Sequence, residues 1–88
     1  MKSRTEARFW RAVDRLTPEV RRRAGIAFRQ FSEDPSTRSL EFKKVGEPSL
    51  CSVRVTDAVR ALGYLEGDTI TWFWIGLHDE YIRRIRTS

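Results

Sequence analysis

The spacing of apolar residues changes at Asp34-Pro35, and this change limits the fold class. Before this point apolar residues recur about every 3.6 positions, which predicts helices, and after it they recur at every second position, which predicts strands. Helices followed by strands are typical of an α+β domain. We therefore expect a helical hairpin packed on a small antiparallel sheet, within one domain that spans residues 1–88.

Two helices are predicted before the change. Thr17-Pro18-Glu19 is a strong helix start, because threonine caps the first turn, proline suits the first helical position and an acid follows. This helix should end near Asp34, since the residue before a proline avoids helical conformation. An earlier helix should run from about residue 5 or 6 to Leu16, so the two helices form a hairpin.

The alternating segments predict strands. We expect a strand at 40–45 and a turn at 46–49, followed by a hairpin at 52–64 and a further strand from residue 69 (TITWFWIG). The expected order is thus two helices, a meander of three antiparallel strands and a short C-terminal helix in the segment HDEYIRRI. Residues 2–5 carry a weak strand pattern and would add a short N-terminal edge strand.

The 52–64 hairpin has a register that its alternation specifies closely. If Val55 faces Val59 on the core side, Arg54 lies directly opposite Arg60 on the other face. Like charges in that position are destabilising. An anion between the two guanidinium groups would make the arrangement favourable. That anion is either a bound phosphate or an internal carboxylate, Asp57 or Glu41.

The last strand is expected to place each small residue opposite a large one. Pairing Val59 with Trp74, Ala61 with Trp72 and Gly63 with Ile70 would fill a core without voids, with both tryptophans inside it. Alternation then gives the other face a basic surface with an aromatic ring at its centre, formed by Lys43, Arg54, Arg60 and Phe73.

The charge balance indicates an anionic partner. Seventeen Lys and Arg against twelve Asp and Glu give a net charge of +5, which favours nucleic acid, an acidic protein or a membrane surface. No apolar run approaches the ~18 residues of a membrane span, so no membrane partner is expected. The start of the chain lacks the apolar stretch of a signal peptide. A single cysteine, Cys51, fits a buried thiol, and we expect a cytoplasmic protein.

His78 is the single histidine and the first candidate for proton transfer. It follows the strand beside Arg60, so it should emerge at the edge of the basic face, and Tyr81 shares its side of the helix. A capping or surface role is the alternative for His78. One histidine and one cysteine cannot form a tetrahedral metal site, and no cofactor-binding motif is present. We therefore expect neither metal nor cofactor.

Four segments together resemble the RelE/ParE superfamily of type II toxins. They are FW…LTPEV…F at 9–31, DP…SLEFKKV at 34–45, SVRV…VRALG at 52–63 and WFWIGLHDEY at 72–81. The resemblance implies the helical hairpin and sheet expected above, with residues 2–5 as an N-terminal strand. It also implies one of two activities. Some members are ribosome-dependent mRNA endoribonucleases, and ParE-like members poison DNA gyrase without catalysis.

The resemblance to the RNase branch implies roles for individual residues. Arg54 and Arg60 match its strand cations, His78 and Tyr81 match its acid/base residues, and Lys43 or Lys44 match its lysines. Ser52 departs from the alternating basic residues of some RNases. Our prediction is metal-independent cleavage by the RNA 2′-hydroxyl, with Phe73 stacking a base. The alternatives are a gyrase poison or a remnant that binds only its antitoxin. The expected partners are an antitoxin with an acidic toxin-binding segment, mRNA and the ribosome, with DNA reached only through the antitoxin.

Overall fold

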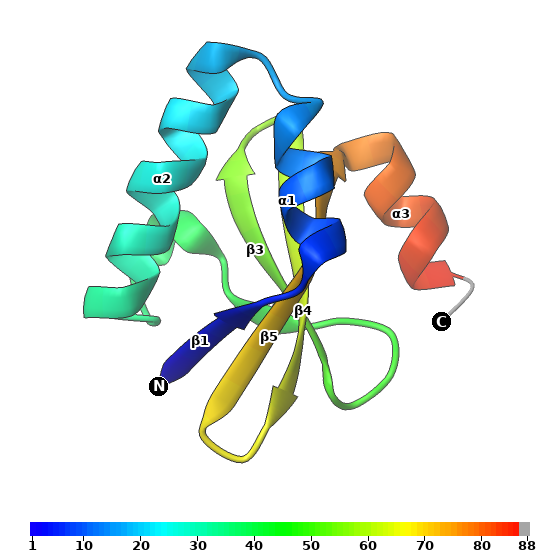
Figure 1. Ribbon diagram of the computed structural model, residues 1–88. Coiled ribbons are helices and arrows are strands. Elements are labelled where there is room, and N and C mark those ends of the chain that lie inside the picture. Colours follow the sequence, from blue (N-terminus) through cyan, green and yellow to red (C-terminus); the bar gives the residue numbers. More distant parts are fainter. Residues whose placement is uncertain (87–88) are drawn as a thin grey trace.

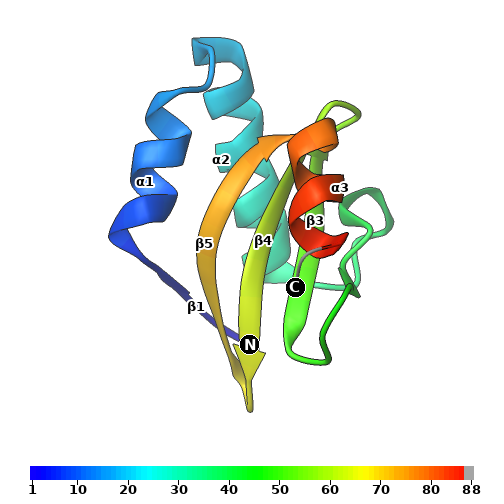
Figure 2. The same ribbon diagram turned by 90° about the vertical axis from the view of Figure 1, so that its right-hand side faces the viewer.

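The computed structural model describes residues 1–86, which form helices on both faces of one sheet (Figure 1). The sheet has five strands in the order β1-β5-β4-β3-β2, of which only β1 and β5 run parallel. Helices α1 and α2 cover one face and α3 covers the other (Figure 2). The expected α+β fold is confirmed. The elements are β1 (Lys2–Thr5), α1 (Ala7–Asp14), α2 (Pro18–Glu33), a 3-10 turn (Arg38–Leu40), β2 (Lys43–Lys44), β3 (Leu50–Thr56), β4 (Val59–Glu66), β5 (Thr69–Leu77) and α3 (His78–Arg86).

The helical hairpin starts and ends as its sequence predicts. The Thr17 hydroxyl accepts a hydrogen bond from the Val20 amide at 3.3 Å, which caps α2, and Pro18 opens the helix. Asp34 ends α2 in an extended conformation, in agreement with the proline that follows it. The first helix is shorter than expected at both ends, because residues up to Thr5 belong to β1 and because the Arg15 and Leu16 amides bond the carbonyls three residues earlier, Ala12 and Val13.

The N-terminal strand is present and pairs in parallel with β5, from Lys2 opposite Thr69 to Thr5 opposite Trp72. All four of its residues are exposed, which explains the weak alternation in its sequence. The last bond runs from the Glu6 amide to the Trp72 carbonyl at 3.0 Å, after which the chain turns into α1. Beyond Trp72, β1 therefore no longer covers the edge of β5.

The expected strand at 40–45 is wrong over most of its length. Residues 38–40 form a 3-10 turn that buries Leu40 to 1% exposure, and Glu41 then adopts a left-handed φ of 45°. A residue in that conformation cannot continue a ladder. Only Lys43 and Lys44 pair with β3, opposite Ser52 and Cys51.

The β3–β4 hairpin confirms the opposed arginines, because Arg54 pairs directly with Arg60. The loop next to them differs from the expectation. Thr56, rather than Val55, pairs with Val59, and the register shifts between Arg54 and Thr56. This bulge leaves Val55 and Val59 both in the core below α1 and α2, as the apolar pattern requires.

The expected register of β4 against β5 is wrong, and a bulge is the reason. Gly63 pairs with Trp72 and Leu62 with Trp74, so Phe73 is an extra residue between them. Because of the extra residue, the side chains of Trp72 and Trp74 lie on opposite faces of the sheet. Trp72 packs below α2 against Phe28, whereas Trp74 lies below α3 with Leu62.

The sheet consequently has a core on each face. The larger one lies under α1 and α2, and the smaller one lies under α3 and contains Leu50, Leu62, Phe73, Trp74 and Tyr81. The face expected to be open and basic is therefore covered along part of its length by α3 (Figure 2). Within residues 1–86 no helix combines the length and the apolar character needed to cross a membrane.

Candidate functional site

A pocket of about 230 Å³ lies beside α3, on the sheet face that this helix covers in part. We call it the His78 pocket. It brings together four of the predicted site residues, Lys43 from β2, Arg60 from β4, and His78 and Tyr81 from α3. It is lined by Glu41, Lys43, Val45, Ser52, Arg60, His78, Tyr81, Ile82 and Ile85. The resulting surface combines two cations, one imidazole and one phenol at a single place.

The end of β5 fixes the position of His78. The His78 amide donates to the Ala58 carbonyl at 2.8 Å, which ties the start of α3 to the β3–β4 turn. The imidazole lies 5.5 Å from the Tyr81 ring, between centroids, at an interplanar angle of 39°. Because the two residues are one helical turn apart, they face the same side of α3.

Tyr81 points into the sheet. Its side chain is 4% exposed, and its hydroxyl donates to the Ser52 hydroxyl at 3.3 Å. Ser52 is 1% exposed and is the one buried polar side chain among the residues that the structure describes. The pair forms the floor of the His78 pocket. Ser52 was missed as a site residue, although it precedes Arg54 by two positions and so shares its face.

Arg54 is paired inside the protein. Its guanidinium contacts the Asp57 carboxylate, its Nε lies 3.4 Å from Glu41, and its Nη1 donates to the Ser39 carbonyl at 3.4 Å. The sequence left two kinds of anion possible beside this arginine, a bound phosphate or an internal carboxylate. In the structure the internal carboxylates of Asp57 and Glu41 pair with it. Arg54 does not line the His78 pocket, but its partner Glu41 does.

Electrostatics around the hairpin turn centre on Asp57. A hydrogen bond from Arg54 and the charge of that guanidinium hold the pKa of Asp57 below its usual range, and the charges of Arg60 and Arg23 act in the same direction. The same pair raises the pKa of Arg54. Asp57 thus lowers the repulsion between the two opposed arginines.

Arg60 faces the pocket with its charge unbalanced by a direct partner. Its Nη1 donates to the carbonyls of Thr56 at 2.6 Å, Val59 at 3.2 Å and Asp57 at 3.3 Å. Within residues 1–86 it forms no ion pair with a carboxylate. The backbone of the turn therefore holds one guanidinium nitrogen and leaves the others to meet an anion.

Two predicted RNA contacts lie outside the His78 pocket. Lys44 is exposed and alternates with Lys43, so it faces the other side of β2. Phe73 is 8% exposed, stacks on Tyr64 at 4.7 Å and carries the Arg8 guanidinium 4.6 Å from its ring centre. These partners leave little ring surface for a base. Among residues 1–86 no three His, Cys, Asp or Glu side chains gather as a metal site would require.

Several solved structures share this fold at low sequence identity. The RelB–RelE complex from Methanococcus jannaschii matches with a TM-score of 0.74 and 16% identity, over 92% of this chain and 96% of that one. The RelBE2 complex from Mycobacterium tuberculosis matches at 0.68 and 18%, over 88% and 96%. YafQ from E. coli matches at 0.70 and 8%, over 91% and 96%. No curated protein sequence matches the chain.

The family assignment follows from sequence and fold together. The profile of the ParE-like toxin domain matches residues 18–83, which run from the first turn of α2 into α3. The fold places a helical hairpin, a sheet and a terminal helix in the arrangement of the RelE and YafQ structures. The chain therefore belongs to the ParE-like toxin domain family.

Proposed function

We propose that this toxin is a metal-independent endoribonuclease that cuts mRNA on the ribosome. The observation that carries the proposal is the meeting of His78, Arg60 and Lys43 in one pocket. A titratable imidazole beside two cations is the combination that phosphodiester cleavage requires. Solved relatives include toxin–antitoxin complexes, so the proposal includes a cognate antitoxin that restrains the activity.

The proposed reaction uses the 2′-hydroxyl of the RNA as the nucleophile. A base takes the 2′-hydroxyl proton while the oxygen bonds to the adjacent phosphorus, and the bond to the 5′-oxygen breaks as an acid protonates that oxygen. His78 serves as base or acid, because an imidazole has one ring nitrogen that can accept a proton and one that can donate one. Tyr81 is the second proton carrier that lines the pocket, held by Ser52.

The cations have distinct parts in this proposal. Arg60 stabilises the charge that develops on the phosphorus oxygens, because it lines the pocket and the backbone carbonyls of the turn engage only its Nη1. Lys43 holds a flanking phosphate. Arg54 supports the site by fixing the turn through Asp57, and it meets the RNA only if the phosphate displaces Glu41. Lys44 contributes to attraction of RNA from outside the pocket.

A second candidate is a toxin that blocks DNA gyrase, or another acidic protein surface, without catalysis. Two observations favour it. The matching family profile is that of the ParE-like toxin domain, and the structure removes Arg54 and Phe73 from the pocket by pairing them internally. Such a mechanism has no need of His78.

The two candidates are separated by inducing the toxin in bacteria and mapping RNA 5′ ends. The RNase proposal predicts new ends within translated frames soon after induction, which the His78→Ala variant fails to produce although it still binds ribosomes. Arg29→Ala is the matched control for His78→Ala, because Arg29 is exposed and lies outside the His78 pocket. Intact transcripts together with trapped gyrase–DNA complexes would instead establish the second candidate.

A further inference from the structure

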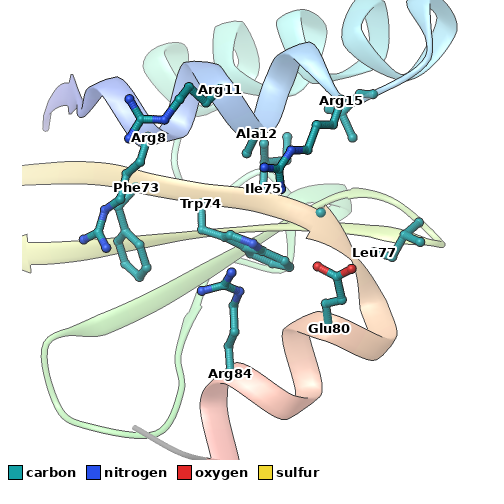
Figure 3. Close-up of a pocket in the computed structure, with 12 residues that line it drawn as sticks. Arg8, Arg11, Ala12, Arg15, Phe73, Trp74, Ile75, Leu77, Glu80 and Arg84 are labelled. Carbon is teal, nitrogen blue, oxygen red and sulfur yellow. The ribbon is translucent and has the colours of Figure 1, made fainter.

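Helix α3 is fixed on the sheet near both of its ends, and Tyr81 lies between the two contacts. At the start, the His78 amide donates to the Ala58 carbonyl at 2.8 Å. Toward the end, the Arg84 guanidinium lies over the Trp74 ring, 4.9 Å from its centre, as Figure 3 shows. The helix thus holds the Tyr81 ring in place, and only the direction of its hydroxyl group remains to be set.

The Tyr81 hydroxyl has its hydrogen-bond partner in the sheet. The ring packs among the apolar residues of the smaller core, and the residue is 4% exposed. The hydroxyl reaches Ser52 on β3, where the two oxygen atoms lie 3.3 Å apart. Among the described residues, Ser52 is the side chain that bonds this hydroxyl. Ser52 therefore decides where the phenol O–H points.

Ser52 lies on the face of β3 that the His78 pocket uses. It pairs directly with Lys43 of β2, and Arg54, two positions further along β3, pairs with Arg60 of β4. Residues that are directly opposite in an antiparallel pair share a face, and both Lys43 and Ser52 line the pocket. Because Ser52 is 1% exposed, bulk water does not compete for its hydroxyl. The serine thus contacts the proposed proton carrier inside the site.

We propose that Ser52 is the positioning residue that makes Tyr81 the acid of the cleavage. This inference rests on the proposed function and deepens it. A serine hydroxyl can both accept and donate a hydrogen bond. Before cleavage it accepts from the phenol, which therefore holds its proton, as an acid must. As that proton passes to the leaving 5′-oxygen, a phenolate remains, and the Ser52 O–H turns to donate to it.

His78 balances the protons of this step. It takes the 2′-hydroxyl proton as that oxygen bonds to phosphorus, and Tyr81 protonates the 5′-oxygen as its bond to phosphorus breaks. The products are a 2′,3′-cyclic phosphate and a 5′-hydroxyl. A proton returned from the imidazolium to the phenolate restores both side chains, whose ring centres lie 5.5 Å apart. Since a hydrogen bond to a charged oxygen is the stronger one, Ser52 should affect the rate more than substrate binding.

The test compares two RNAs that differ in one atom at the cleavage point, the leaving 5′-oxygen or a sulfur in its place. A thiolate leaves without being protonated, so only the ordinary RNA needs the acid. Ser52→Ala should slow single-turnover cleavage of the ordinary RNA about 10- to 100-fold on saturating ribosomes. It should cut the sulfur-substituted RNA at the parent's rate, with the same half-saturating ribosome concentration on both.

Two control variants accompany this test. Cys51→Ala is the matched truncation, because it removes one buried heavy atom from the neighbouring residue of β3, whose side chain lies in the larger core. It should cut both RNAs like the parent. Arg60→Ala should be slow on both RNAs, because Arg60 acts on the phosphorus oxygens and not on the leaving group. A Ser52→Ala variant that remains slow on the sulfur-substituted RNA would overturn the inference.

A double variant covers the case in which Ser52→Ala fails to fold because the Tyr81 hydroxyl is left buried without a partner. Ser52→Ala/Tyr81→Phe removes both hydroxyls, and it should match Tyr81→Phe on the sulfur-substituted RNA. A slower double variant would show that Ser52 acts by another route. A parent that cuts neither RNA refutes the proposed function and this role together, whereas an active parent with a fully active Ser52→Ala variant refutes this role alone.

Discussion

Gly76 allows the clearest quantitative prediction, because Trp74 lies directly on it. A Cβ built at Gly76 would be 2.6 Å from Cζ2 of Trp74 and 3.1 Å from Cη2, far inside van der Waals contact. The indole is 6% exposed and packs in the smaller core below α3. It therefore has little room to move aside, and Gly76→Ala forces it off its position.

The expected cost is that of overpacking a core, about 1–3 kcal/mol. For a domain of this size, each kcal/mol corresponds to a change in Tm of roughly 4–8 °C, so Gly76→Ala should melt roughly 4–24 °C below the parent. Gly25→Ala is the matched control. Gly25 is exposed in α2, and a Cβ added there would have no atom within 4 Å, so alanine should raise stability by about 0.5–1 kcal/mol.

Thermal unfolding followed by circular dichroism at 222 nm, together with urea titration, measures both changes. The two substitutions add the same methyl group and should move Tm in opposite directions. An unchanged or higher Tm for Gly76→Ala would show that Trp74 does not lie over this glycine. The bulge at Phe73, which places Trp74 on the α3 side, would then be wrong as well.

Three further predictions concern the His78 pocket and its surroundings. Arg60→Ala should slow single-turnover cleavage by a factor of about 10²–10³ with little change in Tm. Arg54→Ala, in contrast, should lower Tm and slow cleavage less. The reverse ranking of the two variants would contradict the assigned roles. Tyr81→Phe should lose cleavage while retaining the fold, as near-ultraviolet circular dichroism would show, and an active variant would exclude the phenol as proton carrier. Because Arg54 lowers the pKa of Asp57, the contact stabilises fully above the ordinary carboxylate pKa near 4 and is lost as pH falls through the lowered value. Asp57→Asn should thus melt below the parent at pH 7 and approach it toward pH 2, and a difference that persists in acid would refute this coupling.

The sequence predicted the features that rest on regular alternation or on helix signals. The opposed Arg54 and Arg60, the capped start at Thr17-Pro18 and the terminal helix are all confirmed. The family resemblance is confirmed as well. These features depend on residues close together in the sequence, where periodicity and capping act directly.

The errors arose where one residue interrupts a pattern. The bulge at Phe73 reverses the alternation, so Trp74 moved to the α3 side although its spacing from Trp72 predicted a shared core. At Leu40, burial in the core outweighed the strand pattern and forced Glu41 into a left-handed turn. Neither event leaves a signal in local composition, because tertiary packing decides both.

The relative positions of some candidate residues could be predicted from the sequence, whereas their side-chain contacts could not. Placement at the end of β5 correctly brought His78 and Tyr81 beside Arg60. The pairing of Arg54 with Asp57 and Glu41 could be stated only as one of two alternatives, since side-chain partners across a bulge depend on its exact geometry.

The parallel pairing of β1 with β5 has a consequence for the way this toxin is made. Residues 2–5 find their partners at 69–72, about three quarters of the chain length away. Such distant contacts slow folding and form late, after the loop between them has been closed. During synthesis, the first strand stays unpaired until β5 has emerged, and β5 also leads directly into His78. A chain that ends before β5 therefore lacks both the partner of its first strand and the strand that leads into His78.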